Sequence, residues 1–504
     1  MRGILRVTAL VFACVASVGG NTSASWTHWA PQKFEAATAT AESILAALSR
    51  ARGTGDVAYA ERTEDLTIVA GGERFAATLV VRGEDFRFTT TIDGETYASG
   101  RAGGIRWRRT STGVVHLIEA DTQGDDLDRW PLALFAATRA STSDIVGSAK
   151  TPVAASVVVE RSQTDSPHWF YLDDATGAIV REVVREGSRT VDIRFSDFRS
   201  VGGIRRAFGW HLSGAGGDAD VRVEAVRVGP VAASDVVLPE TATAPFVAAA
   251  GERGHRIPFG FERLHRVVDA RVDGRRARLL LDTGTPQIAL ADAFVRGLHH
   301  PVTLGHAVVD RIEAGDLTAR HVSVGVVPLE GYGVDGILGY DFFLGHVIHI
   351  DYRRERIDWI ARDAFEPDPT MHELDAPARE GMPVVAVGLN ETIADRFVLD
   401  TGSYNVVLLR SLLESVPGAG VLGIEPAAGG TVRQPYLEGA IFTRRQIVRS
   451  MRISNFDFRN VPAQVEVSDR SDAVFFPIDG ILGTELLGNY EWWFDESAGR
   501  VWFR

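Results

Sequence analysis

The sequence predicts a mainly β protein with one N-terminal helix, an antiparallel sheet and two tandem copies of a further β-rich unit. Three observations carry this prediction. Residues 34–51 have apolar side chains at helical spacing, residues 57–228 alternate in short segments between turns, and one sequence plan occurs twice between residues 258 and 504. The length of 504 residues is enough for about three separate cores.

Charge and cysteine content exclude several classes of function. The chain has 53 basic and 66 acidic side chains and a net charge of −13. An acidic surface does not bind the phosphates of nucleic acids, so we expect no nucleic-acid partner. Cys14 is the only cysteine. If it is removed with a leader, the mature chain cannot form disulfides, thiol nucleophiles or cysteine-rich zinc sites.

Residues 1–24 are predicted to be a cleavable signal peptide. Arg2 and Arg6 give a positive start, a short apolar stretch follows, and small residues precede the expected cleavage point. We therefore expect a periplasmic or secreted protein. The sequence has no apolar run of about 20 residues, so we expect no membrane span. The alternative is a lipoprotein anchored at Cys14, which the bulky Phe12 and the short apolar stretch before it disfavour.

Residues 25–228 form the predicted β-rich N-terminal domain. Residues 34–51 are its helix, because Ala, Glu and Leu dominate there and Gly53-Thr54-Gly55 ends it. The segments that follow alternate between apolar and polar residues, and turn residues such as Asp93-Gly94 separate them, which indicates hairpins.

This helix-then-sheet order resembles the half-barrel fold of periplasmic outer-membrane lipoprotein carriers. The stretch YLDDATGAIVREVVREGSRTVDIRFSDFRSVGGI (171–204) is similar to the hairpins of that superfamily. The resemblance implies a curved antiparallel sheet whose concave face holds acyl chains or peptides. A purely structural or docking domain is the alternative.

Two stretches rich in Ala, Pro, Thr and Gly are predicted linkers. They are residues 229–257 and residues 363–381. Between and after them lie two blocks, residues 258–362 and residues 382–504.

The two blocks are copies of one plan. The first contains RLLLDTGTPQIAL (278–290) and the second RFVLDTGSYNVVL (396–408). Asp-Gly-Ile-Leu-Gly follows later in both, at residues 335–339 and 479–483. The later motifs are 144 positions apart and the earlier ones 118, so the second copy has 26 more residues between its motifs (144 − 118). Such a repeat indicates an internal duplication.

An apolar strand that runs into Asp-Thr-Gly-Ser/Thr, followed later by an Ile-Leu-Gly strand and a short helix, resembles the aspartic peptidases. Each block is similar to one retropepsin-like lobe. Together they are similar to the bacterial exported aspartyl protease family. The resemblance implies two acid-protease β-barrel lobes that form a pseudo-dimer within one chain. It implies an aspartic-type endopeptidase without a cofactor.

Asp282 and Asp400 are the candidate catalytic residues. Amide hydrolysis by this route needs a water held between two carboxyls, one ionised as general base and one protonated as general acid. Two adjacent carboxyls cannot both ionise cheaply, so they share a proton. The resemblance implies supporting roles for the residues that follow each aspartate. Thr283 and Thr401 would bond across to the partner loop, and Gly284 and Gly402 would allow close backbone approach. Thr285 and Ser403 would bond to the outer carboxylate oxygens.

A peptidase of this kind covers its substrate with a hairpin flap. We expect the flap of the first lobe in residues 302–310, around Gly305. In the second lobe we expect it in residues 427–434, with Gly429 and Gly430 at the tip. Neither stretch contains a tyrosine of the pepsin kind, which favours retropepsin-like lobes.

The remaining polar clusters do not predict a metal site. His299, His300 and His306 lie close in sequence, but no His-Glu-x-x-His helix or further convergent ligand accompanies them. Residues 121–128 are acidic without the full spacing of a calcium loop, and residues 214–220 resemble a calcium-binding repeat in one copy only.

The sequence therefore predicts an exported aspartic endopeptidase that acts on peptide or protein substrates as a monomer. Two alternatives stay open. One is a catalytically inactive periplasmic protein that keeps the protease fold and binds peptides or lipids. In the other, each lobe pairs with a lobe of another chain.

Overall fold

The computed structural model describes residues 61–504 with gaps, of which the longest cover residues 119–143, 161–167, 241–245, 249–253 and 469–477. The predicted signal peptide, the predicted helix and the acidic segment 121–128 lie outside the described residues. The chain divides into two compact units: the first ends at Pro239, and the second comprises Glu240–Arg504 together with Ser111–Leu117. Within the described part of the chain, no helix is both long and apolar enough to cross a bilayer.

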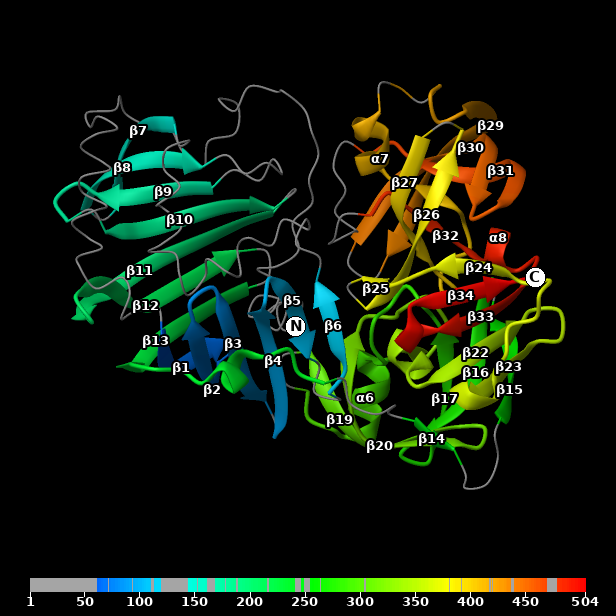
Figure 1. Cartoon of the computed structure of the whole chain (residues 1–504), viewed down its shortest axis with the longest axis horizontal. Coiled ribbons are helices and arrows are strands. Elements are labelled where there is room, and N and C mark those ends of the chain that lie inside the picture. Colours follow the sequence, from blue (N-terminus) through cyan, green and yellow to red (C-terminus); the bar gives the residue numbers. More distant parts are fainter. Residues whose placement is uncertain are drawn as a thin grey trace. The chain divides into compact units, whose positions relative to one another are not determined.

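The first unit is a curved antiparallel sheet (Figure 1), so the mainly β prediction is confirmed. Its strands follow the order β5-β4-β3-β2-β1-β13-β12-β11-β10-β9-β8-β7, so neighbours in sequence are mostly neighbours in space. The strands are β1 (Glu61–Ala70), β2 (Glu73–Arg82), β3 (Asp85–Ile92), β4 (Glu95–Ala102), β5 (Ile105–Arg109), β7 (Asp144–Thr151), β8 (Val153–Glu160), β9 (His168–Asp173), β10 (Ile179–Glu186), β11 (Arg189–Val201), β12 (Ile204–Gly214) and β13 (Gly217–Val228), with β6 (Val115–Ile118) between β5 and β7 in sequence.

A buried carboxylate joins two strands of this sheet. Glu64 of β1 accepts a hydrogen bond from Arg62 Nε at 2.6 Å and also contacts the guanidinium of Arg206 on β12. All three side chains are almost fully buried. Burial opposes ionisation of Glu64, but the charges of Arg206 and Arg62 outweigh it and lower the pKa of Glu64. The carboxylate therefore stays charged and keeps the two guanidinium groups together.

The second unit contains two lobes with one strand plan, as the duplication predicts. Lobe 1 consists of β14 (Phe246–Ala248), β15 (Gly254–Glu262), β16 (His265–Val272), β17 (Arg275–Leu281), β18 (Ala289–Ala291), α6 (Asp292–Leu298), β19 (His306–Ala314), β20 (Leu317–Val327), β21 (Gly336–Leu338), η4 (Tyr340–Phe343), β22 (His346–Asp351) and β23 (Arg356–Ala361). In both lobes an Ile-Leu strand pairs in parallel with the strand before Asp-Thr-Gly: β21 with β17, and β32 with β27.

Lobe 2 repeats this order from β15 onwards, with the counterpart of β15 divided into two strands and with β29 (Ile424–Tyr436) added. It consists of β24 (His372–Asp375), β25 (Ala378–Arg379), β26 (Met382–Leu389), β27 (Thr392–Leu399), β28 (Val407–Leu408), α7 (Arg410–Ser415), β29 (Ile424–Tyr436), β30 (Gly439–Ile453), β31 (Phe456–Glu466), β32 (Gly480–Leu482), α8 (Thr484–Leu487), β33 (Glu491–Asp495) and β34 (Arg500–Phe503). Its sheet has the order β25-β26-β27-β32-β28-β31-β30-β29, with β26 also paired to β30.

One sheet connects the lobes, with the strand order β15-β23-β22-β33-β34-β24. At its centre His349 of β22 is opposite Trp493 of β33, and their rings stack at a centroid distance of 4.2 Å. These residues are 144 positions apart (493 − 349), which is the repeat spacing. The pseudo-twofold axis of the second unit therefore passes between two equivalent residues.

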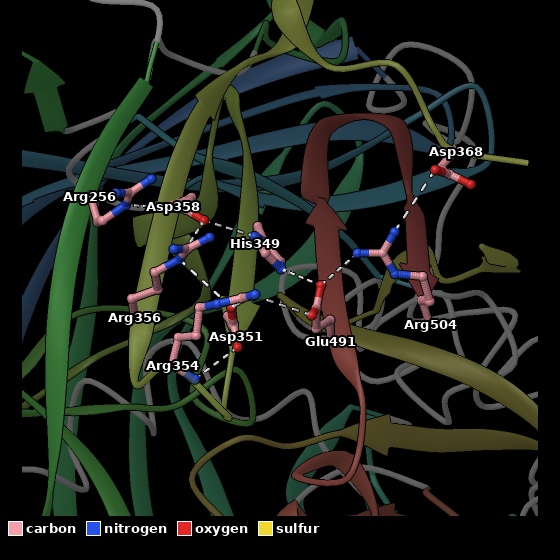
Figure 2. A network of polar contacts seen from close by, with 9 residues as sticks. All are labelled: Arg256, His349, Asp351, Arg354, Arg356, Asp358, Asp368, Glu491 and Arg504. Carbon is pink, nitrogen blue, oxygen red and sulfur yellow. Dashed lines mark hydrogen bonds and ion pairs between the residues drawn. The ribbon is translucent and has the colours of Figure 1, made fainter. Parts of the chain in front are cut away.

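The two faces of the connecting sheet differ. Ile348, Ile350, Trp492 and Phe494 are fully buried on one face, within the main apolar core that both lobes share. His349 is on the other face, where Figure 2 shows it between two carboxylates from different lobes. Its Nδ1 lies 2.9 Å from Asp358 Oδ2, and its Nε2 lies 3.4 Å from Glu491 Oε2. The shared apolar core thus lies on one face of these strands, and the charged network lies on the other beside a smaller apolar cluster around Trp493.

Both predicted linkers contain strands. Residues 363–381 include β24, which pairs with β34, the last strand of the connecting sheet. Residues 229–257 include β14, which pairs with β20 of lobe 1. Their Pro-, Ala- and Gly-rich composition indicated loops, but open strand edges in the second unit supply backbone partners that composition does not report.

We expect Glu64→Gln to lower the free energy of unfolding of the first unit by about 3–5 kcal/mol, because it removes the charge that compensates two buried guanidinium groups. Urea denaturation of the full chain measures the change. The matched control is Glu84→Gln: Glu84 also pairs with an arginine, Arg101 at 3.0 Å, but its side chain is 82% exposed. The control should change stability by less than about 1 kcal/mol. Equal effects of the two substitutions would contradict the structural role of Glu64.

Candidate active site

The two Asp-Thr-Gly loops begin at equivalent strand ends. β17 ends at Leu281 and β27 ends at Leu399, so Asp282 and Asp400 are the next residues. Both strands are buried apolar runs at this end, as is typical of strands covered on both faces. The backbone N–H of Asp282 donates to Leu338 O, and that of Asp400 donates to Leu482 O, each at 3.0 Å. The Ile-Leu strands thus hold the loops from behind.

Two threonines connect the loops reciprocally. The N–H of Thr283 donates to Thr401 Oγ1 at 3.1 Å, and the N–H of Thr401 donates to Thr283 Oγ1 at 3.0 Å. Each hydroxyl also donates across the interface: Thr283 Oγ1 to Leu399 O at 2.6 Å and Thr401 Oγ1 to Leu281 O at 2.9 Å. Both threonines are buried. Four hydrogen bonds therefore fix one loop against the other without water competing for them.

Each glycine of the motif lies against the carboxyl group of the opposite lobe. A Cβ on Gly284 would lie 2.5 Å from Asp400 Cγ, and a Cβ on Gly402 would lie even closer to Asp282 Cγ. Neither glycine has a positive φ. Glycine is therefore required here by space and not by backbone conformation.

The hydrogen bonds to the two carboxyl groups are not equivalent. Asp282 accepts from Gly284 N and from Thr285 Oγ1, both at 2.8 Å. Asp400 accepts from the backbone N–H groups of Gly402 at 2.8 Å and Ser403 at 3.0 Å. The Ser403 hydroxyl points elsewhere and donates to Asn405 O at 3.4 Å. The structure thus brings all the predicted support residues to the dyad, but only Thr285 uses its side chain on a carboxylate.

Burial and the surrounding groups affect the pKa values of the two carboxyls differently. Burial raises the pKa of Asp400 well above its usual range, and the neighbouring charge of Asp282 and the hydrogen bond between the two carboxyls raise it further. Burial also raises the pKa of Asp282, but bonds from Thr285, Asp400 and Gly284 and the charge of His265 oppose the rise. The neighbouring groups therefore favour the ionised form of Asp282 and the protonated form of Asp400.

Several side chains around the dyad carry no local signal in the sequence. His265, the first residue of β16, has its Nδ1 3.0 Å from Gly402 O, and its ring lies 6.1 Å from that of Tyr332. The charge of Asp282 contributes to a raised pKa of Tyr332 after the larger effect of burial. Isolated His and Tyr residues have many roles, and only the tertiary contacts assign these two to the site.

The aspartates that open the Asp-Gly-Ile-Leu-Gly motif in both copies have a structural role. Asp335 Oδ2 accepts the backbone N–H of Arg278 at 2.9 Å, and Asp479 Oδ1 accepts from the Arg396 guanidinium at 3.0 Å. Both contacts fix the start of an Ile-Leu strand beside the strand that leads to the dyad.

The flap prediction needs correction in both lobes. In lobe 2, β29 and β30 form a long hairpin that pairs Tyr436 with Gly439, so the chain reverses between these two residues. Gly429 and Gly430 lie within β29, where the register shifts between Pro426 and Thr431. Consecutive glycines predicted a turn, but here they belong to an irregular stretch of a paired strand.

In lobe 1 the segment between the helix and the next strand is too short to form such a hairpin. Its helix α6 ends at Leu298 and β19 begins at His306, which leaves seven residues between them (299–305). Gly305 directly precedes β19, and its carbonyl accepts from Val326 N at 2.6 Å. Gly305 is thus a strand-entry residue, and the 26 extra residues of the second copy correspond to the β29–β30 hairpin.

The described residues contain no group of His, Cys, Asp and Glu side chains that could hold a metal ion. His299 ends α6 in a left-handed conformation, and His300 Nε2 lies 2.7 Å from Asp273 Oδ2. His306 is in β19, and burial lowers its pKa to about 4. The three histidines therefore have separate places. Residues 214–220 lie where β12 and β13 meet in a hairpin that pairs Gly214 with Gly217.

One comparison with known families matches most of lobe 2. Residues 385–486 match the family model described as Aspartyl protease. No protein of curated function matches the chain. Among solved structures, a LolA superfamily protein from Nitrosomonas europaea is 11% identical, with 40% of this chain and 99% of that one covered and a TM-score of 0.29. An aspartic proteinase from Irpex lacteus is also 11% identical, with 50% and 96% covered and a TM-score of 0.30.

We expect Thr401→Val to lower the free energy of unfolding of the second unit by about 2–4 kcal/mol. The substitution preserves shape but leaves the buried N–H of Thr283 and the carbonyl of Leu281 without this partner, at about 1–3 kcal/mol each. Urea denaturation of the full chain measures it. The control is Thr370→Val, whose hydroxyl bonds Asp368 at 2.6 Å on the surface and whose loss should cost less than about 0.5 kcal/mol. A Thr401 variant as stable as the control would refute the contribution to stability that we assign to these hydrogen bonds.

Proposed function

We propose that this protein is an aspartic-type endopeptidase whose two lobes each supply one carboxyl of a single dyad. The observation that carries the proposal is the reciprocal arrangement of Asp282, Thr283, Asp400 and Thr401 across the pseudo-twofold axis. The family match of lobe 2 supports the class of chemistry. Because both carboxyls belong to one chain, we further propose that the monomer is the active species.

The proposed roles of the two carboxyls follow from their inequality. Asp282, ionised and supported by Thr285 and Gly284, takes a proton from a water that attacks the peptide carbonyl carbon. Asp400, which holds the shared proton, donates it to the carbonyl oxygen and gives a tetrahedral diol. Asp282 then passes its proton to the amide nitrogen while Asp400 takes back a hydroxyl proton, and the C–N bond breaks. The dyad returns to its starting state with one proton.

The β29–β30 hairpin is the proposed cover for an extended substrate. Val432 and Phe442 lie on its two strands with side chains on opposite faces, and they are 52% and 49% exposed. Near the tip of the hairpin, Ile441, which pairs with Gln434, is buried in a cluster with Met382 and Val398 next to the lobe 2 loop. Apolar side chains on a hairpin anchored beside the dyad suit contacts with the apolar side chains of a peptide. We also propose export to the periplasm or secretion, on the leader-like residues 1–24.

Asp282→Asn and Asp400→Asn are each expected to abolish cleavage of casein or of a peptide library, because either change removes the single-proton state. Far-UV circular dichroism and thermal unfolding should show an intact fold, since Asn can accept the same backbone bonds. The control is Asp335→Asn, which changes an aspartate of the repeat outside the dyad. Full hydrolysis by a purified Asp400→Asn variant would refute the proposal that both carboxyls are needed for catalysis. An inert wild-type protein that still binds peptides would favour the binding-protein alternative.

The pH dependence of kcat/KM should be bell-shaped. The rate rises with pH as Asp282 loses its proton and falls at higher pH as Asp400 loses the one it must donate. Burial raises the pKa of both groups, so both limbs should lie at higher pH than the ordinary aspartate value of 3.8. Steady-state kinetics across the pH range measures both limbs. A rate that falls steadily as pH rises from below 3.8 would contradict the ionised role of Asp282.

A further inference from the structure

His265 is the one imidazole that contacts a dyad loop of the other lobe among the described residues. It opens β16 in lobe 1, and its Nδ1 lies 3.0 Å from the carbonyl oxygen of Gly402 in lobe 2. A carbonyl only accepts, so Nδ1 carries a hydrogen and Nε2 is the nitrogen that gains or loses the titratable proton. The contact therefore fixes the tautomer of the neutral ring and crosses between the lobes.

Gly402 is a sensitive point for such a contact. Its N–H donates to Asp400 Oδ1 at 2.8 Å, and its Cα lies against the carboxyl of Asp282. A hydrogen bond to its carbonyl therefore restrains a residue that contacts both carboxyls. The charge of a protonated His265 also acts on Asp282, whose pKa it lowers against the larger opposing effect of burial.

Lobe 2 has no imidazole at the equivalent place. His265 lies two residues before Val267, and Val267 pairs with Leu280. In lobe 2 the residue paired with Val398 is Val384, and two residues before it is Met382. Leu280 and Val398 are repeat equivalents (398 − 280 = 118). The duplicated frame thus carries an imidazole at this place in lobe 1 and a buried thioether at the equivalent place in lobe 2.

The other charged groups around His265 are already engaged. Glu262, opposite it in the β15–β16 pair, forms an ion pair with Arg278 at 2.8 Å. Arg266 donates to Thr484 Oγ1 at 2.6 Å, and burial lowers its pKa. Burial raises the pKa of Tyr332, so this neighbouring ring is neutral. Of the two dyad carboxyls, Asp282 is the one whose pKa the charge of His265 lowers.

We propose that His265 is a positioning residue that holds the lobe 2 loop through Gly402 and, when protonated, makes Asp282 the ionised member of the dyad. This inference rests on the proposed function, and it gives an electrostatic reason why Asp282 acts as the base and Asp400 as the acid. The duplicated motif alone does not distinguish the two aspartates, since both follow apolar strands and precede Thr-Gly. The imidazole from lobe 1 breaks that symmetry in the same direction as the Thr285 hydroxyl.

The test compares two substitutions. Gln at position 265 can still donate to Gly402 O but carries no charge, whereas Leu can do neither. For His265→Gln we expect the acid limb of kcat/KM to move to higher pH by about 0.5–1 pH unit, because the charge that favours ionised Asp282 is lost, with kcat near the optimum largely kept. For His265→Leu we expect the same move and a roughly tenfold or greater loss of kcat, because the loop is also released.

The control is His372→Gln. His372 lies in β24 and bonds Asn455 at 2.9 Å, so the acid limb should not move. An unmoved acid limb in His265→Gln overturns the electrostatic role, and unchanged kcat in His265→Leu overturns the positioning role. If the Leu variant fails to fold, the Gln variant decides the electrostatic role, and kcat and thermal unfolding of His265→Ala against His265→Gln decide the hold on Gly402.

A second measurement separates this inference from the proposed function. Carbon-13 NMR of aspartate carboxyls, assigned with the two Asn variants, follows proton loss from the dyad without any substrate. The first ionisation should occur at higher pH in His265→Gln than in the wild type. An inert wild type with this difference would refute peptidase activity and keep the role of His265. Identical titrations in both proteins would refute the role of His265 whether or not peptides are cleaved.

Discussion

The reciprocal hydrogen bonds between Thr283 and Thr401 are the constraint on which the second unit depends. Each hydroxyl accepts from the backbone of the other loop and donates to the strand that precedes it. Because the four bonds cross between the lobes and are buried, one loop cannot shift without the other. This rigidity keeps two carboxyls adjacent although burial and mutual repulsion both oppose it. The rest of the unit supports these loops.

The connecting sheet provides the second part of this support. Its central pair, His349 and Trp493, lies on the same pseudo-twofold axis that relates the two loops. One face is a shared apolar core, and the other carries ion pairs between the lobes, with Asp358 and Glu491 on either side of His349 (Figure 2). At Asp358 burial opposes ionisation, but Arg256, His349 and Arg356 outweigh burial and lower the pKa of this carboxyl. Two separate features, the threonine bonds between the loops and the connecting sheet, thus fix the orientation of the lobes.

Duplication made the lobes alike in plan, and the departures from symmetry carry the proposed function. The β29–β30 hairpin has no counterpart in lobe 1, and Thr285 binds Asp282 while the Ser403 hydroxyl turns away from Asp400. The sequence predicted the 26-residue excess but not its form. Gly429 and Gly430 indicated a turn because local composition reports flexibility, whereas pairing with β30 placed them inside a strand. Linker composition misled in the same way at β14 and β24.

The sequence by itself determined the β-rich class, the duplication and the pair Asp282 and Asp400, because apolar runs, turn residues and repeated motifs are local signals. Only the tertiary structure decided that the pair is unequal. His265 is 137 residues before Gly402, and Met382 fills the matching place in lobe 2. Which group faces a carboxyl depends on the crossing of strands from two lobes, and no spacing along one chain encodes that crossing.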